Sequence, residues 1–151
     1  MFTDLNLSIA RHLQEFNKLS GLEGALESYD EEDWRDKVRF KKESYNRILL
    51  SRQDRYEIYL LCWKKNQKSH IHDHPENGCL LKVLNGALEE RRFNVDPLDK
   101  TVKIISTKIL DKDSISYLEG DQIVHQIWAL EDSVTLHIYS PPGHHYNSYK
   151  L

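Results

Sequence analysis

The sequence has few cysteines, no long apolar run and no large excess of one charge. Two cysteines are too few for a disulfide framework in a chain of 151 residues, which fits a reducing compartment. No stretch approaches the roughly 18 consecutive apolar residues that a membrane-spanning helix needs, and the N-terminus lacks the basic and apolar segments of a secretory signal. We therefore expect a soluble, cytoplasmic protein that does not bind membranes.

The charges are balanced and mixed along the chain. The 21 basic and 24 acidic residues leave a net charge of -3, which argues against a nucleic-acid partner, because such proteins carry a strongly basic face. The chain is long enough to bury one sizeable core and too short to favour two. We therefore expect a single domain over residues 1–151.

The sequence pattern changes near residue 40. Before it, Ile9, Leu13 and Phe16 follow the spacing of a helical apolar stripe, which predicts short helices within residues 1–40. After it, short runs rich in Ile, Val, Tyr and Leu alternate with turns, which predicts an all-β dominated fold, a small antiparallel barrel or sandwich over residues 41–146. The expected strands are 45–51, 56–63, 78–85, 87–95, 101–110, 114–119, 123–130 and 133–140.

The stretch SHIHDHPENGC, residues 69–79, has histidines at alternate positions. On a strand, His70, His72 and His74 would point to one face and Asp73 to the other. Two imidazoles at such spacing can reach one metal ion, and neutral imidazole is the commonest protein ligand for transition metals. We therefore predict a metal site that uses His72 and His74. A solvated polar strand edge is the alternative.

A third ligand must come from another segment. His125 and His137 both lie in expected apolar strands, and we select His125, which follows a turn at Gly120. Three neutral histidines leave a divalent ion its full charge, so such a site favours an anionic ligand. His144 and His145 are adjacent and would diverge on an extended chain, so we place them in a mobile C-terminal tail.

Two motifs of the chain resemble those of the cupin superfamily. The first is the pair His72-x-His74 followed by Gly86, and the second is Gly120 followed by His125. The resemblance implies a cupin barrel whose two motifs supply the metal ligands.

Cys79 points to one family within that superfamily. Cupins normally carry a glutamate ligand at this position, whereas cysteine dioxygenases have cysteine or glycine, and residues 61–90 are similar to theirs nearly throughout. Residues 45–49 (YNRIL) and 133–142 (SVTLHIYSPP) also resemble segments of that family, in the same order. The resemblance covers about residues 40–146.

This resemblance implies an iron(II)-dependent enzyme that oxidises L-cysteine with O2 to cysteine sulfinic acid. His72, His74 and His125 would hold Fe(II), on which the substrate thiol would be deprotonated. Arg47 matches the family position that binds the substrate carboxylate, since a guanidinium forms two parallel hydrogen bonds with it. Tyr45 lies two residues earlier on the same strand face and would add a hydroxyl group.

The resemblance also implies roles for two groups on other strands. Thr135, His137 and Tyr139 alternate along one expected strand, and in the family such residues form a relay that orients the tyrosine hydroxyl. A thioether between Cys79 and Tyr139 is a further implication, with a buried free thiol as the alternative. We expect Trp63 to pack against the pocket.

Two other functions remain open from the sequence. One is a thiol dioxygenase that acts on 3-mercaptopropionate or cysteamine; relatives that prefer 3-mercaptopropionate carry glutamine at the position of Arg47, so the arginine favours cysteine. The other is a non-catalytic cupin or zinc-binding module, because three histidines and a water also bind zinc. The oligomeric state is open, and we favour a monomer.

Overall fold

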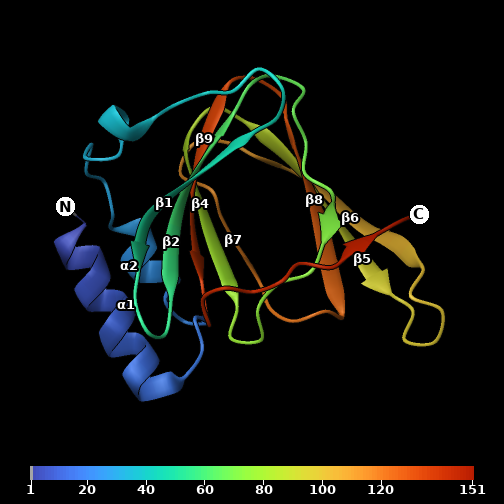
Figure 1. Ribbon diagram of the computed structural model, residues 1–151, viewed down its shortest axis with the longest axis horizontal. Coiled ribbons are helices and arrows are strands. Elements are labelled where there is room, and N and C mark those ends of the chain that lie inside the picture. The colour runs from blue at the N-terminus through green and yellow to red at the C-terminus, as the bar shows by residue number, and fades with distance from the viewer. Residues whose placement is uncertain (1) are drawn as a thin grey trace.

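The computed structural model describes residues 2–151 as two antiparallel sheets of five strands each, with helices on one side (Figure 1). Within those residues, no helix is long and apolar enough to cross a membrane. The elements are α1 (Thr3–Phe16), α2 (Glu23–Glu27), a 3-10 helix (Arg35–Lys37), β1 (Asn46–Arg52), β2 (Glu57–Trp63), β3 (Ile71–His72), β4 (Cys79–Asn85), β5 (Leu88–Val95), β6 (Val102–Leu110), β7 (Ile115–Leu118), β8 (Ile123–Ala129), β9 (Ser133–Tyr139) and β10 (Ser148–Tyr149).

The strand order is β1-β2-β9-β4-β7 in the first sheet and β10-β3-β8-β5-β6 in the second. This arrangement confirms the predicted β-dominated barrel with a helical N-terminal part, and all eight expected strands are present to within two residues at each end. The eight expected strands did not include β3 and β10, although strand alternation was assumed around His72. Each has two residues, too few to show the alternation by which a strand is recognised.

The first sheet buries a different set of side chains on each face. On β9, Leu136 and Ile138 join the apolar cluster under α1 and α2, whereas Thr135, His137 and Tyr139 point the other way. Alternate residues of a strand face opposite sides, so the apolar positions fix the direction of the polar ones. Each buried leucine or isoleucine contributes about 1.5–3 kcal/mol, and this helix-side packing therefore holds the three polar side chains inside the barrel.

The C-terminal segment is part of the second sheet. Ser148 lies opposite His72 and Tyr149 opposite Ile71 in the register of β10 with β3. The expectation of a mobile tail at His144 is therefore wrong: its Nε2 lies 2.9 Å from a carboxylate oxygen of Asp73. The tail was inferred because two adjacent side chains diverge on an extended chain and cannot share one metal ion, but His144 binds a buried carboxylate instead.

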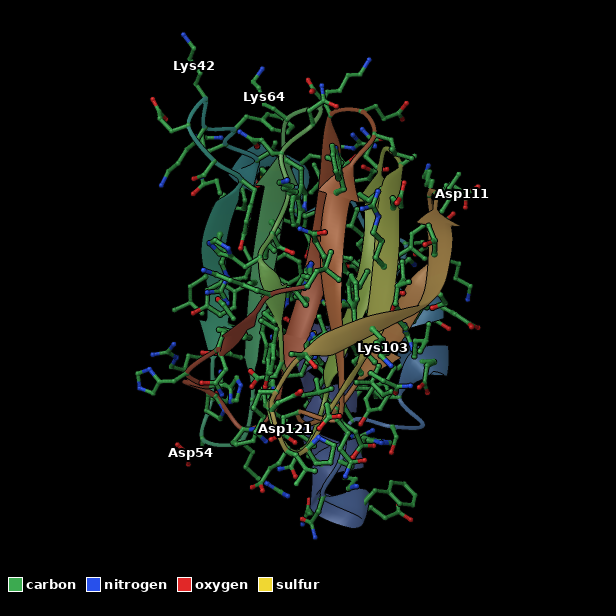
Figure 2. All side chains as sticks on the ribbon, turned by 90° about the vertical axis from the view of Figure 1, so that its right-hand side faces the viewer. Lys42, Asp54, Lys64, Lys103, Asp111 and Asp121 are labelled. Carbon is green, nitrogen blue, oxygen red and sulfur yellow. The ribbon has the colours of Figure 1, made fainter. Side chains whose placement is uncertain are left out.

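The surface carries charges of both signs. Figure 2 shows Lys42 and Lys64 at one end of the barrel and Asp54 and Asp121 at the other, with Lys103 beside β6 on the face toward the viewer. This mixture agrees with the small net charge of -3.

Candidate active site

His72, His74 and His125 point their rings at one place inside the barrel. The Nε2 atom of His125 lies 3.0 Å from Nε2 of His74 and 3.2 Å from Nε2 of His72. One potential ligand atom from each ring lies within 4.8 Å of the others. His72 on β3 is directly opposite His125 on β8, so strand pairing brings the two sequence motifs together.

The turn at Gly120 positions His74. The backbone N–H of His74 donates to the carbonyl of Gly120 (3.0 Å), and the N–H of Gly120 donates to the carbonyl of Pro75 (3.1 Å). Gly120 has a φ of 69°, in the left-handed region that glycine adopts without strain. The glycine of the second motif thus fixes the loop of the first.

Outer hydrogen bonds fix the protons of two of the rings. The Nδ1 of His125 donates to Oε2 of Glu90 (2.8 Å), and the Nδ1 of His72 donates to the carbonyl of His70 (2.8 Å). Both partners can only accept, so each Nδ1 carries a proton, and in the neutral form of each ring Nε2 presents a lone pair. Two lone pairs 3.2 Å apart repel each other unless a cation binds both. This donor set therefore fits a divalent metal ion.

The rings of His72 and His74 are neutral, as metal ligands must be. Burial and the neighbouring His125 lower the pKa of His72 to about 3, and burial lowers the pKa of His74 well below its usual value. Among residues 2–151, Nδ1 of His74 is the buried side-chain nitrogen without a hydrogen-bond partner. The orientation of this ring therefore depends on packing and on its backbone bond to Gly120.

Glu90 is a site residue that the sequence analysis missed. It is 1% exposed on β5 and accepts hydrogen bonds from His125, from Ser116 (2.7 Å) and from Arg92 (3.2 Å). Burial alone would raise its pKa, but the hydrogen bond and charge of His125, with Arg92 and Ser116, lower it to about 2. The carboxylate absent from the histidine cluster thus lies directly behind one of its rings.

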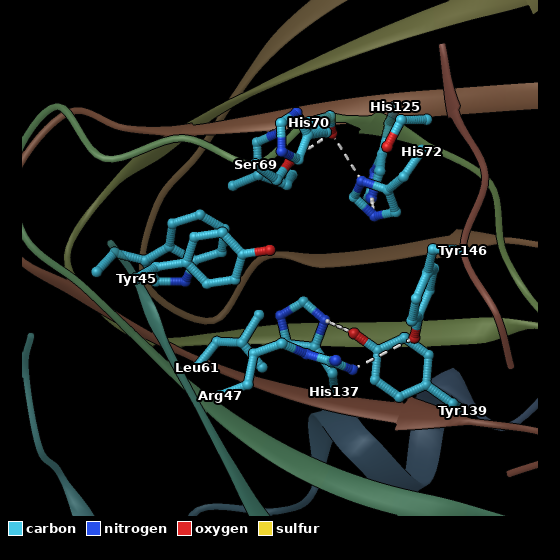
Figure 3. A pocket seen from close by; sticks show the side chains of 13 residues that line it. Tyr45, Arg47, Leu61, Ser69, His70, His72, His125, His137, Tyr139 and Tyr146 are labelled. Atoms are coloured by element: carbon cyan, nitrogen blue, oxygen red, sulfur yellow. Dashed lines mark hydrogen bonds between the residues drawn. The ribbon is translucent and has the colours of Figure 1, made fainter. Parts of the chain in front are cut away.

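A cavity of about 110 Å³ lies beside the histidine cluster, between the two sheets. Figure 3 shows His72 and His125 on one side of it and Arg47, His137 and Tyr139 on the opposite side. A cavity of this size suits a molecule of a few heavy atoms, well below the 300 Å³ or so of a typical drug-sized site. The structure therefore brings two of the predicted metal-binding residues, His72 and His125, and the predicted substrate-binding residues to one small pocket, with His74 in the same histidine cluster.

Arg47 extends from β1 into the pocket. Its guanidinium carbon lies 4.4 Å from the ring centre of Tyr59 and 5.7 Å from that of Tyr139. Its Nη2 donates a long hydrogen bond (3.4 Å) to the hydroxyl of Tyr146. The aromatic faces attract the cation and hold it opposite the histidine cluster, where it can accept an anionic group.

Thr135, His137 and Tyr139 form a hydrogen-bonded row on β9. Thr135 Oγ1 is 2.8 Å from Nε2 of His137, and the Tyr139 hydroxyl is 3.1 Å from Nδ1. Burial lowers the pKa of His137 well below its usual value and raises that of Tyr139 well above. The imidazole and the phenol are therefore both neutral, and the row fixes the direction of the phenol hydroxyl.

Two further aromatic residues form the remaining predicted wall. Tyr45 stacks on Trp63 with ring centres 4.3 Å apart, and the indole Nε1 of Trp63 donates to Thr135 Oγ1 (3.0 Å). Trp63 therefore packs against the pocket as expected, and it also fixes the hydroxyl group at the start of the polar row.

Cys79 lies directly opposite Tyr139 in the register of β4 with β9. Side chains at such positions have Cβ atoms about 5 Å apart. Cys79 is 3% exposed, and burial raises the pKa of its thiol. The two partners of the predicted thioether are therefore neighbours.

Tyr146 is the second site residue that the sequence analysis missed. Its ring centre lies 5.7 Å from that of His72 and 5.9 Å from that of Tyr139, so it borders both sides of the pocket. It comes from the C-terminal segment that was expected to be mobile. An aromatic residue between two histidines and an asparagine gave no periodic signal that could have placed it.

Comparison with known proteins places the chain in a family. The family model "Cysteine dioxygenase type I" matches residues 4–151. The chain is 30% identical over 129 residues to "Cysteine dioxygenase type 1" of Danio rerio and to that of Bos taurus, covering 80% of this chain and 64% of each relative. It thus spans 64% of the length of these curated relatives.

The solved structures show the fold. A cupin protein from Desulfovibrio desulfuricans aligns with a TM-score of 0.52 and 21% identity over 70% of this chain and 91% of that one. A double-stranded beta-helix protein from Klebsiella pneumoniae aligns with a TM-score of 0.60 and 14% identity over 78% and 94%. The fold is therefore a cupin barrel, and the chain belongs to the cysteine dioxygenase type I family.

Proposed function

We propose that this protein is an iron(II)-dependent dioxygenase that converts L-cysteine and O2 to cysteine sulfinic acid. The observation that carries the proposal is a cavity of about 110 Å³ with two imidazoles of the three-histidine cluster, His72 and His125, on one side and the guanidinium of Arg47 on the other. Membership of the family supports oxidation of a small thiol. The choice of cysteine as substrate depends on Arg47.

His72, His74 and His125 would hold the metal. Iron(II) bound there would supply a Lewis acid on which a thiol ionises and meets dioxygen. The three rings are neutral ligands, so they leave the charge of the ion uncompensated and favour a thiolate. Glu90 keeps His125 in the tautomer that presents its Nε2 lone pair to the site.

Arg47 would bind the substrate carboxylate. Its planar guanidinium can donate two parallel hydrogen bonds to a carboxylate, and the facing tyrosine rings restrict its movement. A substrate held at both its sulfur and its carboxylate has one orientation in the cavity, which lowers the entropic cost of reaction. Cysteamine lacks a carboxylate and would lose this contact. Tyr45 also lines the cavity.

Tyr139 would keep a proton at its hydroxyl throughout the reaction. Because burial raises its pKa well above the usual value, the phenol acts as a hydrogen-bond donor and not as a phenolate. His137 and Thr135 keep that hydroxyl in one direction. These residues therefore position a neutral donor in the pocket.

The pairing of Cys79 with Tyr139 supports a thioether between Sγ and a carbon of the phenol ring. Its formation breaks the S–H bond of Cys79 and one ring C–H bond of Tyr139, and O2 is reduced to H2O2 by the two hydrogens, so the mass of the intact chain should fall by that of two hydrogens. We expect this loss after turnover with cysteine and O2, and no loss in Cys79→Ser. A wild-type mass that stays constant would leave Cys79 as a buried free thiol.

Oxygen uptake tests the function directly. The iron-loaded protein should consume O2 faster with cysteine than with 3-mercaptopropionate or cysteamine, and cysteine sulfinic acid should be the product. Faster turnover of 3-mercaptopropionate would overturn the substrate assignment. Stoichiometric zinc together with no O2 uptake for any thiol would instead indicate a metal-binding module. The single domain, the monomeric state and the cytoplasmic location stay predictions from the sequence.

A further inference from the structure

We propose that the C-terminal segment, residues 143–149, forms the specificity-determining wall of the pocket, and that Tyr146 limits the length of the thiol that fits. This inference rests on the proposed oxidation of small thiols. This segment follows β9, runs across to the second sheet and ends in β10 (Figure 1). Two of its residues, Tyr146 and Ser148, line the pocket.

Asp73 is the main anchor of this segment. Its carboxylate is 1% exposed and accepts four hydrogen bonds: from His144 Nε2 (2.9 Å), from the backbone and side-chain nitrogens of Asn147 (3.1 and 2.8 Å) and from the Tyr149 hydroxyl (3.2 Å). All four donors belong to the C-terminal segment. A buried carboxylate is costly unless it is satisfied, so the segment and Asp73 require each other.

A second buried carboxylate holds the beginning of the segment. The backbone N–H of Gly143 donates to Oε1 of Glu57 (3.2 Å), and Glu57 is 3% exposed and bound to Arg52 (2.6 Å). At the other end, Ser148 pairs with His72 in the sheet. The residues between these two attachments are therefore fixed over the pocket.

Tyr146 lies between the attachments and enters the pocket. Its ring is close to the rings of His72 and Tyr139, and its hydroxyl accepts a hydrogen bond from Arg47. Figure 3 shows the phenol standing at one end of the pocket, between the histidine side and the arginine side. A substrate that joins these two sides passes beside the ring, which leaves little room for a longer chain.

A wall at Tyr146 should discriminate between thiols that differ by one methylene group. Discrimination by one methylene group in an apolar pocket is worth about 10- to 200-fold in kcat/KM. Homocysteine differs from cysteine by one methylene and keeps its thiol, amine and carboxylate. In Tyr146→Ala, the ratio of homocysteine to cysteine kcat/KM should rise by about 10-fold or more.

Tyr146→Phe is the matched control, because it keeps the ring and removes only the hydroxyl that contacts Arg47. We expect its selectivity ratio to stay within about 3-fold of wild type, since one long hydrogen bond is lost. Binding of both thiols under anaerobic conditions, measured by calorimetry, gives a second readout that needs no turnover. A Tyr146→Ala variant with wild-type thermal stability and unchanged ratios in both measurements would overturn the inference. A wild-type protein that oxidises no thiol would overturn the proposed function instead.

Asp73 is tested by the mobility of the segment it holds. In Asp73→Asn, amide hydrogens of residues 144–149 should exchange faster by about 10-fold or more, since one broken contact of a buried charge costs at least 1.4 kcal/mol. The same variant should relax thiol selectivity as Tyr146→Ala does, while its metal content stays unchanged. Asp54→Asn, at an exposed turn, is the control. If the amide hydrogens of residues 144–149 exchanged at the wild-type rate in both Asp73→Asn and His144→Gln, the anchoring role of Asp73 would be contradicted.

Discussion

The two sheets of the barrel supply different chemistry to the same pocket. The second sheet contributes imidazoles from β3 and β8, with the carboxylate of Glu90 behind that of β8 on β5. The first contributes a guanidinium from β1 and a row of hydroxyl and imidazole groups from β9. Under the proposed function, His72 and His125, which would hold the metal, and Arg47, which would bind the substrate carboxylate, lie on different sheets, so substitutions should affect the two separately.

The two sheets also differ in what covers their outer faces. The first sheet packs its outward side chains, such as Leu60 and Leu136, under α1 and α2. The second has a smaller outer cluster that includes Ile71 and Val124, to which Tyr149 of the C-terminal segment adds. Large apolar burial outside the first sheet offsets the cost of placing polar groups inside it. On the inner face of the second sheet, the buried charged groups are stabilised instead by hydrogen bonds to one another.

The largest effect should come from removing a histidine of the second sheet. In His74→Ala we expect metal affinity to fall by more than about 100-fold, because one of three ligand atoms is gone. Removing a residue that only hydrogen-bonds to a ligand typically costs about 10- to 100-fold. His70→Ala is the matched control, since His70 holds His72 through its backbone carbonyl, which the substitution keeps. Metal analysis after dialysis measures both. Equal metal content in the two variants would contradict the assignment of the cluster.

A change on the first sheet should leave the metal bound. In Arg47→Gln we expect unchanged metal content and a loss of about 10- to 100-fold in kcat/KM for cysteine, the value of charge-assisted hydrogen bonds to one carboxylate. Steady-state oxygen uptake and metal analysis on the same samples check this. If Arg47→Gln oxidised the preferred thiol of the wild-type protein with unchanged kcat/KM, the result would indicate a substrate other than cysteine.

A smaller effect should follow from Glu90→Gln. The neutral amide no longer requires a proton on Nδ1 of His125 and withdraws a negative charge from behind the ring, so metal affinity should fall by about 10-fold. Glu89→Gln, on the same strand with a partly exposed side chain, is the control and should bind metal as wild type does. If both variants bound the metal with wild-type affinity, the three histidines alone would account for metal binding and Glu90 would not contribute.

The sequence predicted the parts of this site that follow a period. Alternation placed His72 and His74 on one face, and the turn at Gly120 identified His125 as their partner. Glu90 could not be found in this way, because it lies in the charged run LEERR, which is typical of a solvated strand, and its burial depends on long-range contacts with His125 and Ser116.

The C-terminal contribution was missed for a different reason. Tyr146 and its neighbours have no regular pattern, and β10 has two residues. What fixes them is the buried carboxylate of Asp73, which alternation correctly turned away from the metal site. A contact between residues more than 70 positions apart leaves no local signal in one sequence.

The smallest expected effect concerns a histidine that belongs to the first sheet and not to the metal cluster. Burial keeps the pKa of His137 well below its unfolded value of about 6.5, so the unfolded chain binds a proton below that pH that the folded chain does not. The free energy of unfolding should therefore fall, as pH decreases below 6.5, by up to about 1.4 kcal/mol per pH unit from this residue. In His137→Gln this contribution is absent while hydrogen bonds to Thr135 and Tyr139 remain feasible. Thermal unfolding of both metal-free proteins at pH 6.5 and 5 measures the difference, since other titrating groups are common to both. If the free energy of unfolding changed with pH in the same way in both proteins, the ring of His137 would be protonated in the folded state. The first sheet would then place a second cation beside Arg47, and the neutral row on β9 would be wrong.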